Sequence, residues 1–256
     1  MCPPTYYGVK YSINPWMKGE IVDQMRALDQ WGDLKDAIEK WRAQVNLLAP
    51  NKNLPDMVFT ANGALVHGDV AVLSNFKHDE RIGEYSHFRR WFMDQGYSVH
   101  TLRPSYKFEG AGDAIIHRNT IIGGYGFRSD LKALEKVADI LNMNLVPLKL
   151  KDPRFYHLDM CLALLDKKNG FGIYYPDAFE AKNISTLTNL KLLKAPKEEA
   201  QKFVCNSISY DSQVIMPANN KWTADALRKL NYEVTEVETS EYLKAGGSAQ
   251  CLALWV

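Results

Sequence analysis

Runs of apolar residues begin at five evenly spaced points along the chain. The runs start at Phe59, Phe108, His157, Phe203 and Ser248, so consecutive starts lie 49, 49, 46 and 45 residues apart. Self-similarity at a fixed period of this length is typical of repeat architectures. The spacing therefore predicts a chain built from repeated units, although hairpin–helix–strand sequences also recur by chance in α/β proteins.

The first four units show the same order of elements. Two apolar strands are joined by a turn in VFTANGALVHGDVAVLSNF, FEGAGDAIIHRNTIIGGY, HLDMCLALLDKKNGFGIYYP and FVCNSISYDSQVIMPA, where HGD, HRN, KKNG and YDS are the turn signals. A helical stretch follows, as in EYSHFRRWFMDQG, DLKALEKVADILN or WTADALRKLN. In the second of these, Leu131, Leu134, Val137 and Leu141 recur at the spacing of one helix face. A short strand closes the unit in YSVHTL, NLVPLKL or YEVTEVE.

The fifth unit is divided between the two ends of the chain. The last residues, GGSAQCLALWV, alternate at Leu252, Leu254 and Val256 as a half-buried strand does. The beginning of the chain supplies YGVKYSI and a helix-rich segment from Glu20 to Leu48. We therefore expect an α/β fold, a five-bladed α/β propeller of pseudosymmetric ββαβ units. It would be one catalytic domain over residues 1–256, with its ends adjacent and its sheet edges protected by closure.

Composition and charge exclude several classes of function. Of the 256 residues, 46% are hydrophobic and 24% are charged, which fits a globular protein with a sizeable core. The chain has 31 basic and 30 acidic residues, so its net charge is +1. A charge this small gives no electrostatic field that would attract nucleic acid or an anionic membrane. The beginning, MCPPTYYGVKYSINPWM, lacks the pattern of a signal peptide, and no apolar run is long enough to span a membrane. We expect a cytoplasmic protein.

The four cysteines are far apart and predict neither disulfides nor a structural zinc site. Cys2, Cys161, Cys205 and Cys251 form no CxxC pair, and ligands or partners of either kind usually come in close pairs. His157 and Cys161 would lie roughly 13 Å apart on a strand, which argues against a shared metal. We therefore expect reduced thiols and no metal.

Polar residues occupy equivalent positions at the start of four units, where the repeat would bring them to one axis. They are Asn62, Glu109 with Asp113, His157 with Asp159, and Cys251. Polar and ionisable groups are costly in a core, so a ring of them favours a catalytic pocket. Taken alone, Cys251 reads as a buried structural cysteine and His157 as a structural histidine. Together with Glu109 they suit a thiolate nucleophile, a proton carrier and a carboxylate that orients its ring.

Glycines beside these residues suggest close approach of the backbone to a ligand. In FEGAGDA, Gly110 and Gly112 separate the two acids, and Gly246 and Gly247 precede Cys251. FEGAGDA is not a phosphate-binding loop, because it lacks the GxGxxG spacing and leads into a strand.

Four ordered motifs resemble the guanidino-group-modifying superfamily with the pentein fold. They are DMVFTANGALV, FEGAGDA, YHLDMCLALL and GGSAQCLAL, and together they cover nearly the entire chain. The superfamily includes arginine deiminases, dimethylarginine dimethylaminohydrolases and amidinotransferases. The beginning of the chain looks most like the arginine dihydrolase branch, which takes arginine to ornithine.

The resemblance implies a role for each motif residue. Cys251 would be the nucleophile, His157 the general acid and base, and Glu109 the residue that orients His157. Arg81 and Arg128 would hold the substrate carboxylate. Further substrate contacts are implied for Asn62, Asp113, Asp159, Phe59, Asn14 and Ser248. It implies a small-molecule substrate, arginine or a close derivative, and no cofactor; a homo-oligomer is left open.

Asn62 departs from many arginine deiminases, which carry aspartate there, and resembles the dihydrolases. A carboxylate only accepts hydrogen bonds, whereas an amide also donates and can retain neutral citrulline for a second attack. The expected reaction therefore gives ornithine, ammonia and carbon dioxide through a covalent thiouronium intermediate. Arginine deiminase, dimethylarginine dimethylaminohydrolase and amidinotransferase activities remain alternatives, as does a non-catalytic binding protein with the same fold.

Overall fold

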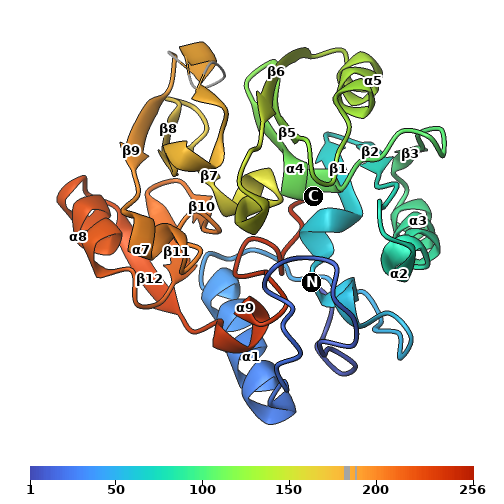
Figure 1. Cartoon of the computed structure of the whole chain (residues 1–256), viewed down its shortest axis with the longest axis horizontal. Helices are drawn as coiled ribbons and strands as arrows, with labels where there is room; N and C mark the ends of the chain where they lie inside the picture. The colour runs from blue at the N-terminus through green and yellow to red at the C-terminus, as the bar shows by residue number, and fades with distance from the viewer. Residues whose placement is uncertain (182–184, 188) are drawn as a thin grey trace.

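The computed structural model describes residues 1–181, 185–187 and 189–256, and four small sheets dominate it. The sheets surround a common centre, and helices cover their outer side (Figure 1). In chain order the strands are β1 (Ala64–His67), β2 (Val70–Leu73), β3 (Ser98–His100), β4 (Ala114–His117), β5 (Thr120–Tyr125), β6 (Asn144–Lys149), β7 (Leu162–Asp166), β8 (Phe171–Tyr174), β9 (Lys191–Lys194), β10 (Ile208–Tyr210), β11 (Gln213–Pro217) and β12 (Glu233–Val237).

Each sheet has the same topology. Three consecutive strands lie in sequence order, the first pair antiparallel and the second pair parallel, so the second strand is always central. The same holds for the third and fourth sheets. The parallel pair requires a crossover, which the helical stretches supply. The predicted order of hairpin, helix and strand is therefore confirmed for the first, second and fourth units, in which a crossover helix was predicted.

Helices and short helical turns connect these strands. The α-helices are α1 (Gln24–Glu39), α2 (Asp79–Ile82), α3 (Glu84–Asp94), α4 (Gly110–Asp113), α5 (Leu131–Leu141), α7 (Lys197–Ala200), α8 (Lys221–Lys229) and α9 (Ser240–Leu243). The 3₁₀ turns are η1 (Pro55–Val58), η2 (Thr60–Gly63), η3 (Pro153–Phe155), η4 (Leu158–Met160), η5 (Pro176–Ala178) and η6 (Ser185–Leu187).

All four hairpin turns use a residue in the left-handed region. Gly68, Arg118, Gly170 and Asp211 have φ of 59°, 53°, 73° and 51°. Short turns with positive φ match the right-handed twist of the flanking strands, which explains why the sequence signals HGD, HRN, KKNG and YDS mark them.

The helix α5 packs on its own sheet and on the neighbouring sheet of β1 and β2. Ala133, Leu134, Val137 and Ala138 are buried and pack on Leu65, Val72, Phe108 and Ile121. The predicted apolar face is confirmed at Leu134 and Val137, while Leu131 and Leu141 at its ends are only partly buried. Asn142, with φ of 51°, ends the helix in a left-handed cap.

The fifth sector of the molecule differs from the prediction. It contains α1 and α9 (Figure 1), but the predicted strand at GGSAQCLALWV is wrong, as is the strand expected at YGVKYSI. The C-terminal backbone instead bonds to turns of other units, because Ala61 N–H donates to the Cys251 carbonyl and Gln250 N–H to the Asn206 carbonyl. With its backbone groups paired in this way, the segment has no strand partner.

Two further observations concern the ends and the thiols. Met1 and Val256 line the same hollow, so the chain ends lie close together. All four cysteines are buried and unpaired.

No helix in the described part of the chain is long and apolar enough to cross a membrane.

Candidate active site

Five of the residues singled out by the motifs lie in, or cap, short turns that precede the first strands of three sheets, β1, β4 and β7. Asn62 is in η2, Asp113 in α4 and Asp159 in η4, while Glu109 and His157 cap the last two turns. The prediction that these side chains sit on the first strands is therefore corrected by a few residues. Because each turn enters its strand at the central end, the turns of different units meet there.

Gly110 and Gly112 allow this meeting. Gly110 has φ of 59°, and a Cβ there would lie 2.8 Å from the carbonyl oxygens of Ala61 and Ala64. A Cβ at Gly112 would lie 2.3 Å from Asn62 Nδ2. The two glycines therefore let α4 pack directly on η2. The expectation that their backbone approaches a ligand stays a prediction.

A small cavity lies where these turns meet. Seven of the predicted site residues line it: Asn14, Phe59, Asn62, Arg81, Arg128, His157 and Cys251. Gly246 and Gly247 line it as well, as expected from their place before Cys251. The cavity is lined by residues of the N-terminal segment, of the turns before β1 and β7, of α2, of the segment after β5 and of the C-terminal segment.

The Cys251 thiol is buried and contacts two polar side chains. Asp159 Oδ2 lies 3.3 Å from Sγ, and Asn206 Nδ2 lies 3.1 Å from it. Burial, and next the neighbouring Asp159 carboxylate, raise the pKa of the Cys251 thiol well above its usual range. Burial also raises the pKa of Asp159 to about 7. The thiol of the substrate-free protein is thus protonated, and a cation placed beside it would favour its ionisation.

Glu109 connects His157 to Arg128. The carboxylate oxygen Oε2 lies 2.8 Å from His157 Nε2 and accepts from Arg128 Nη1 at 3.0 Å. Burial opposes the charge on Glu109, but Arg128 and the bond to His157 outweigh it and hold the pKa of Glu109 well below its usual range. The permanent carboxylate fixes one ring nitrogen of His157 and leaves Nδ1 for proton transfer.

Arg81 is held by a network that also orients Asn62. Its guanidinium forms a bidentate pair with Glu84 at 2.8 Å and 2.8 Å, and it stacks on the Phe76 ring. Arg81 Nη1 donates to Asn62 Oδ1 at 2.9 Å. The Asn62 oxygen must therefore face Arg81, and its Nδ2 is buried without a hydrogen-bond partner. A buried unpaired donor in a cavity wall indicates a missing acceptor.

Three predicted substrate-binding residues, Asp113, Asp159 and Ser248, are not among the residues that line the cavity. Both Asp113 oxygens are engaged, one by Ser129 Oγ at 2.6 Å and one by the Leu158 N–H at 3.1 Å. The Ser248 hydroxyl pairs with Thr239 Oγ1 at 2.6 Å. In both residues these polar atoms join turns of the protein, and the expected side-chain contact with substrate stays a prediction. Asp159 differs, since its Oδ1 is buried and unpartnered.

Sequence reasoning missed two polar residues of the cavity wall. Asp56 is buried with Oδ1 unpartnered, and burial raises the pKa of its carboxyl above the usual value. The Tyr156 hydroxyl donates to the Gly246 carbonyl at 2.7 Å, and its ring lies under Arg128. They are the first residues of the motifs DMVFTANGALV and YHLDMCLALL, but nothing in a local pattern distinguishes a cavity-lining Asp or Tyr from a surface one.

Asn206 is the third residue that sequence reasoning missed, and a signal for it existed. Phe203 and Asn206 in FVCNSISY repeat the spacing of Phe59 and Asn62 in the first unit. The fourth unit therefore also presents an amide at the centre of the molecule.

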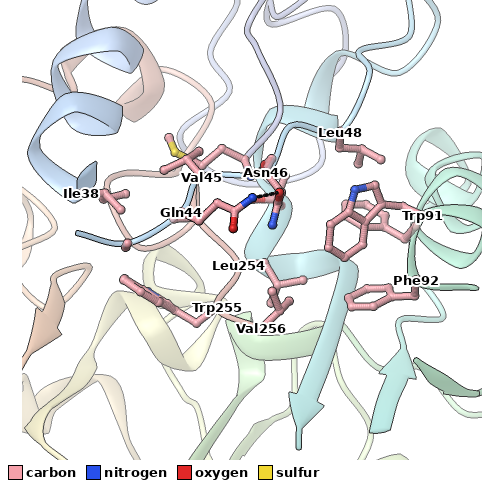
Figure 2. A pocket seen from close by; sticks show the side chains of 15 residues that line it. Ile38, Gln44, Val45, Asn46, Leu48, Trp91, Phe92, Leu254, Trp255 and Val256 are labelled. Atoms are coloured by element: carbon pink, nitrogen blue, oxygen red, sulfur yellow. Dashed lines mark hydrogen bonds between the residues drawn. The ribbon is translucent and has the colours of Figure 1, made fainter. Parts of the chain in front are cut away.

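Two larger hollows lie outside this cavity. The hollow of Figure 2 is lined mainly by apolar side chains, including Trp91, Phe92, Leu254 and Trp255, and by no ionisable side chain. A second hollow of about 410 Å³ opens between the first strands of the four sheets, with Asp159 and Gln250 among its lining residues. Among the residues that the structure describes, no three His, Cys, Asp or Glu side chains are grouped as metal ligands would be.

Comparison with known proteins places this site in a family. Residues 12–255 match the family model of eukaryotic N,N dimethylarginine dimethylhydrolase. The chain is 41% identical to the bifunctional arginine dihydrolase/ornithine cyclodeaminase AgrE of Nostoc sp. over 100% of its own length, and it spans 37% of that relative. The chain is also 41% identical to the bifunctional arginine dihydrolase/ornithine cyclodeaminase ArgZ of Synechocystis sp., and it spans 37% of that protein's length. The chain is 37% identical to the N(G),N(G)-dimethylarginine dimethylaminohydrolase of Mycobacterium tuberculosis, covering 99% of this chain and 84% of that protein.

Solved structures agree with the sequence matches. The crystal structure of the N-terminal domain of ArgZ bound to substrate, described as an arginine dihydrolase from cyanobacteria, matches with a TM-score of 0.95 at 41% identity, covering 99% of this chain and 96% of that one. With a family model over nearly its full length and relatives at this level of identity, the chain belongs to the N,N-dimethylarginine dimethylhydrolase family of guanidino-modifying enzymes.

Proposed function

We propose that the protein is an arginine dihydrolase, which hydrolyses L-arginine to ornithine, two molecules of ammonia and carbon dioxide. One observation carries the proposal: a buried thiol, a histidine tied to an ionised carboxylate and two buried arginines share one small cavity with an unpaired asparagine amide. The cyanobacterial relatives described as arginine dihydrolases support the same reading.

Substrate recognition follows from the unsatisfied groups of the cavity. Arg128 has donors to spare and suits the substrate carboxylate, while the free oxygen of Asp56 suits the α-ammonium group. The free Oδ1 of Asp159 accepts from the guanidinium, beside the Cys251 thiol. The bound cation thereby replaces the proton that Asp159 and Cys251 share in the empty protein.

The first half of the reaction releases one ammonia. The Cys251 thiolate attacks the guanidinium carbon and forms a C–S bond, giving a tetrahedral adduct. His157 protonates the leaving nitrogen, the C–N bond breaks and a thiouronium remains. His157 then takes a proton from water, the hydroxide attacks the same carbon and the C–S bond breaks, which yields citrulline and the free thiolate.

The second half repeats the chemistry on citrulline. The Asn62 amide, whose Nδ2 has no partner in the empty site, donates to the ureido oxygen and retains the neutral product. A second thiolate attack expels the second ammonia. Water cleaves the resulting thiocarbamate to a carbamate, which loses carbon dioxide and leaves ornithine.

The architecture proposed with this function is a single catalytic domain of five units. Four sheets share one topology, and α1 with α9 occupies the sector that a fifth unit would fill (Figure 1). A cytoplasmic location is part of the same proposal and agrees with four unpaired cysteines.

The experiment that tests the function counts products. Purified protein is incubated with arginine, and ornithine, citrulline and ammonia are quantified, with Cys251→Ser as the inactive control. Two ammonia and one ornithine per arginine are expected, and acid-quenched wild type should carry an arginine-derived adduct on Cys251. Accumulation of citrulline with one ammonia would identify a deiminase instead.

A second candidate function is hydrolysis of N-methylated arginine, because the matching family model and the Mycobacterium tuberculosis relative carry that description. The same assay with N(G),N(G)-dimethylarginine decides between them. If dimethylamine is released faster than arginine releases ammonia, the protein is a dimethylaminohydrolase and the dihydrolase proposal is wrong.

A further inference from the structure

Asn206 makes direct contact with the sulfur of Cys251 and has no role in the recognised motifs. Its Nδ2 lies 3.1 Å from Sγ, and the side chain is 0% exposed. The ionisable groups around the thiol are Asp159, which touches it, and those that share its cavity, namely Asp56, Arg81, Arg128, Tyr156 and His157. Asn206 is a neutral donor among these charges.

The orientation of the Asn206 amide is fixed by the protein backbone. The Cys251 N–H donates to Asn206 Oδ1 at 3.1 Å, so the oxygen must face that backbone group. The NH₂ group then faces the sulfur, and it also reaches the Asp159 carbonyl at 3.3 Å. An amide turned the other way would place its oxygen against the sulfur and two donors against the Cys251 N–H.

The backbone of Asn206 holds the same geometry. Its N–H donates to the Phe203 carbonyl at 2.8 Å, and its carbonyl accepts from the Gln250 N–H at 3.1 Å. Both the side-chain oxygen and the backbone carbonyl of Asn206 are therefore bonded to the segment that carries Cys251. The amide donor cannot rotate away from Sγ without breaking several buried hydrogen bonds.

We propose that Asn206 is a catalytic residue: it donates a hydrogen bond to the Cys251 thiolate and so stabilises the nucleophile. The proposal deepens the proposed function, on which it rests only in taking Cys251 as the reacting atom. A thiolate in a buried site needs a hydrogen-bond donor or a cation beside it, and many enzymes supply a histidinium or a lysine side chain for this purpose. Here a cation at that position would repel the guanidinium of the substrate, whereas an amide stabilises the anion without competing for the cationic site.

The test measures ionisation of Cys251 without any substrate. The full chain is alkylated with iodoacetamide over a range of pH, and modification of the Cys251 peptide is followed by mass spectrometry. Asn206→Asp keeps an acceptor for the Cys251 N–H but loses the donor, and Asn206→Leu is uncharged and has a similar volume. In both variants the alkylation rate near neutral pH should fall by about 10- to 100-fold, the range for a hydrogen bond to a charged group. The midpoint of the pH profile should rise.

The control variant is Ser207→Ala. The Ser207 hydroxyl bonds to the Val204 carbonyl at 2.6 Å within the same turn and does not touch Cys251. Its loss should lower the melting temperature and leave the pH profile of alkylation unchanged. Folded Asn206 variants whose Cys251 is alkylated with the wild-type pH profile would overturn the proposal. In that case the loss of Asn206 would change only the stability of the protein, as expected for a structural residue.

A measurement on the wild-type protein covers the case in which the variants do not fold. With ¹⁵N-labelled asparagine, the Asn206 side-chain amide should shift through the pH step at which Cys251 ionises, and this step should vanish in Cys251→Ala. An amide signal that stays constant through the step would reject the assignment. Neither readout uses arginine turnover. The role of Asn206 can therefore be rejected while the arginine dihydrolase function is supported, and the dihydrolase function can be rejected while the role of Asn206 is supported.

Discussion

Single side chains at the cavity are distinguished by which of their polar atoms are already occupied. Arg81 satisfies the oxygen of Asn62 and leaves its Nδ2 free, and Cys251 occupies one oxygen of Asp159 and leaves the other free. Asp113 differs, because each of its oxygens already accepts a hydrogen bond from the protein. A native interior seldom leaves such groups unsatisfied, so the unpaired atoms of Asn62 and Asp159 support the substrate contacts proposed above.

Asn62→Asp should change the product rather than abolish the reaction. The carboxylate keeps the bond from Arg81 but presents an acceptor to the ureido oxygen of citrulline. An unsatisfied buried pair of this kind costs roughly 1–3 kcal/mol, which would shorten the residence of citrulline by about tenfold or more. Chromatography should show ornithine from the wild type and mainly citrulline from the variant, with citrulline itself a poor substrate for the variant. Equal ornithine from both proteins would show that Asn62 does not select the product.

Arginine binding should strengthen as the pH rises toward about 7. Burial raises the pKa of Asp159 to about 7, so below that pH the empty site holds a proton that the guanidinium must displace. In the Cys251→Ser background, calorimetry should show Kd falling about tenfold per pH unit up to that value and levelling off above it, with proton release on binding.

The matched control for this pH dependence is Asp159→Asn in the same background. It should bind more weakly at pH 8 and lose the dependence below 7. Asp113, whose pKa burial raises to about 6, faces Ser129 and the Leu158 N–H rather than the cavity and should not contribute. A steep pH dependence that survives Asp159→Asn would point to another group.

At the scale of elements, the site depends on the turns that precede the first strands. The strands themselves are short hairpins with ordinary two-faced packing, whereas η2, α4 and η4 carry the polar side chains and touch one another. Gly110 is the point of closest approach, where α4 meets the backbone of the neighbouring unit.

Gly110→Ala should destabilise the protein more than an equivalent change elsewhere. The new Cβ meets two carbonyl oxygens at 2.8 Å and also carries the cost of a left-handed alanine, about 1–2 kcal/mol by itself. Gly68→Ala is the control, because Gly68 has the same φ of 59° and nothing within 4 Å of its added Cβ. Urea unfolding should show a loss of about 1 kcal/mol for Gly68→Ala and at least about twice that for Gly110→Ala. Equal losses would mean that α4 moves away from η2 at no cost.

At the scale of the whole molecule, contacts between α1 and α9 join the N-terminal and C-terminal segments. Gln30 is buried; its Nε2 donates to Ser240 Oγ at 2.8 Å and its Oε1 accepts from the Glu241 N–H at 3.0 Å. The Tyr242 hydroxyl donates to the Ala27 carbonyl at 2.6 Å. Cys251 lies a few residues beyond α9, so these contacts help to hold the segment that carries the nucleophile.

Gln30→Leu should loosen both segments together. It leaves the Glu241 N–H and the Ser240 hydroxyl without partners, at a cost of about 1–3 kcal/mol for a buried unsatisfied group. Hydrogen exchange should accelerate in both Gln24–Glu39 and Ser240–Leu243. Gln213→Leu is the control, since Gln213 bonds to Glu233 at an exposed site within one sheet. Faster exchange in α1 with none in α9 would contradict the idea that the two segments act as one unit.

Local sequence determined the repeated elements and the residue types at the centre. Three of the four hairpin turns could be predicted because glycine or aspartate adopts positive φ at low cost, whereas Arg118 takes that conformation in the remaining one. The helix α5 could be predicted because its apolar face recurs every three or four residues. The even spacing of the motifs was enough to predict that His157, Glu109 and Cys251 belong to one site.

Only the tertiary structure decided which polar atoms meet. Asn206 contacts Cys251 across 45 residues and Glu109 contacts His157 across 48, distances over which no local pattern reports a hydrogen bond. For the same reason sequence patterning wrongly predicted a C-terminal strand. Periodicity records which face of a segment is buried, but the pairing of donors and acceptors depends on segments that folding brings together from distant parts of the chain.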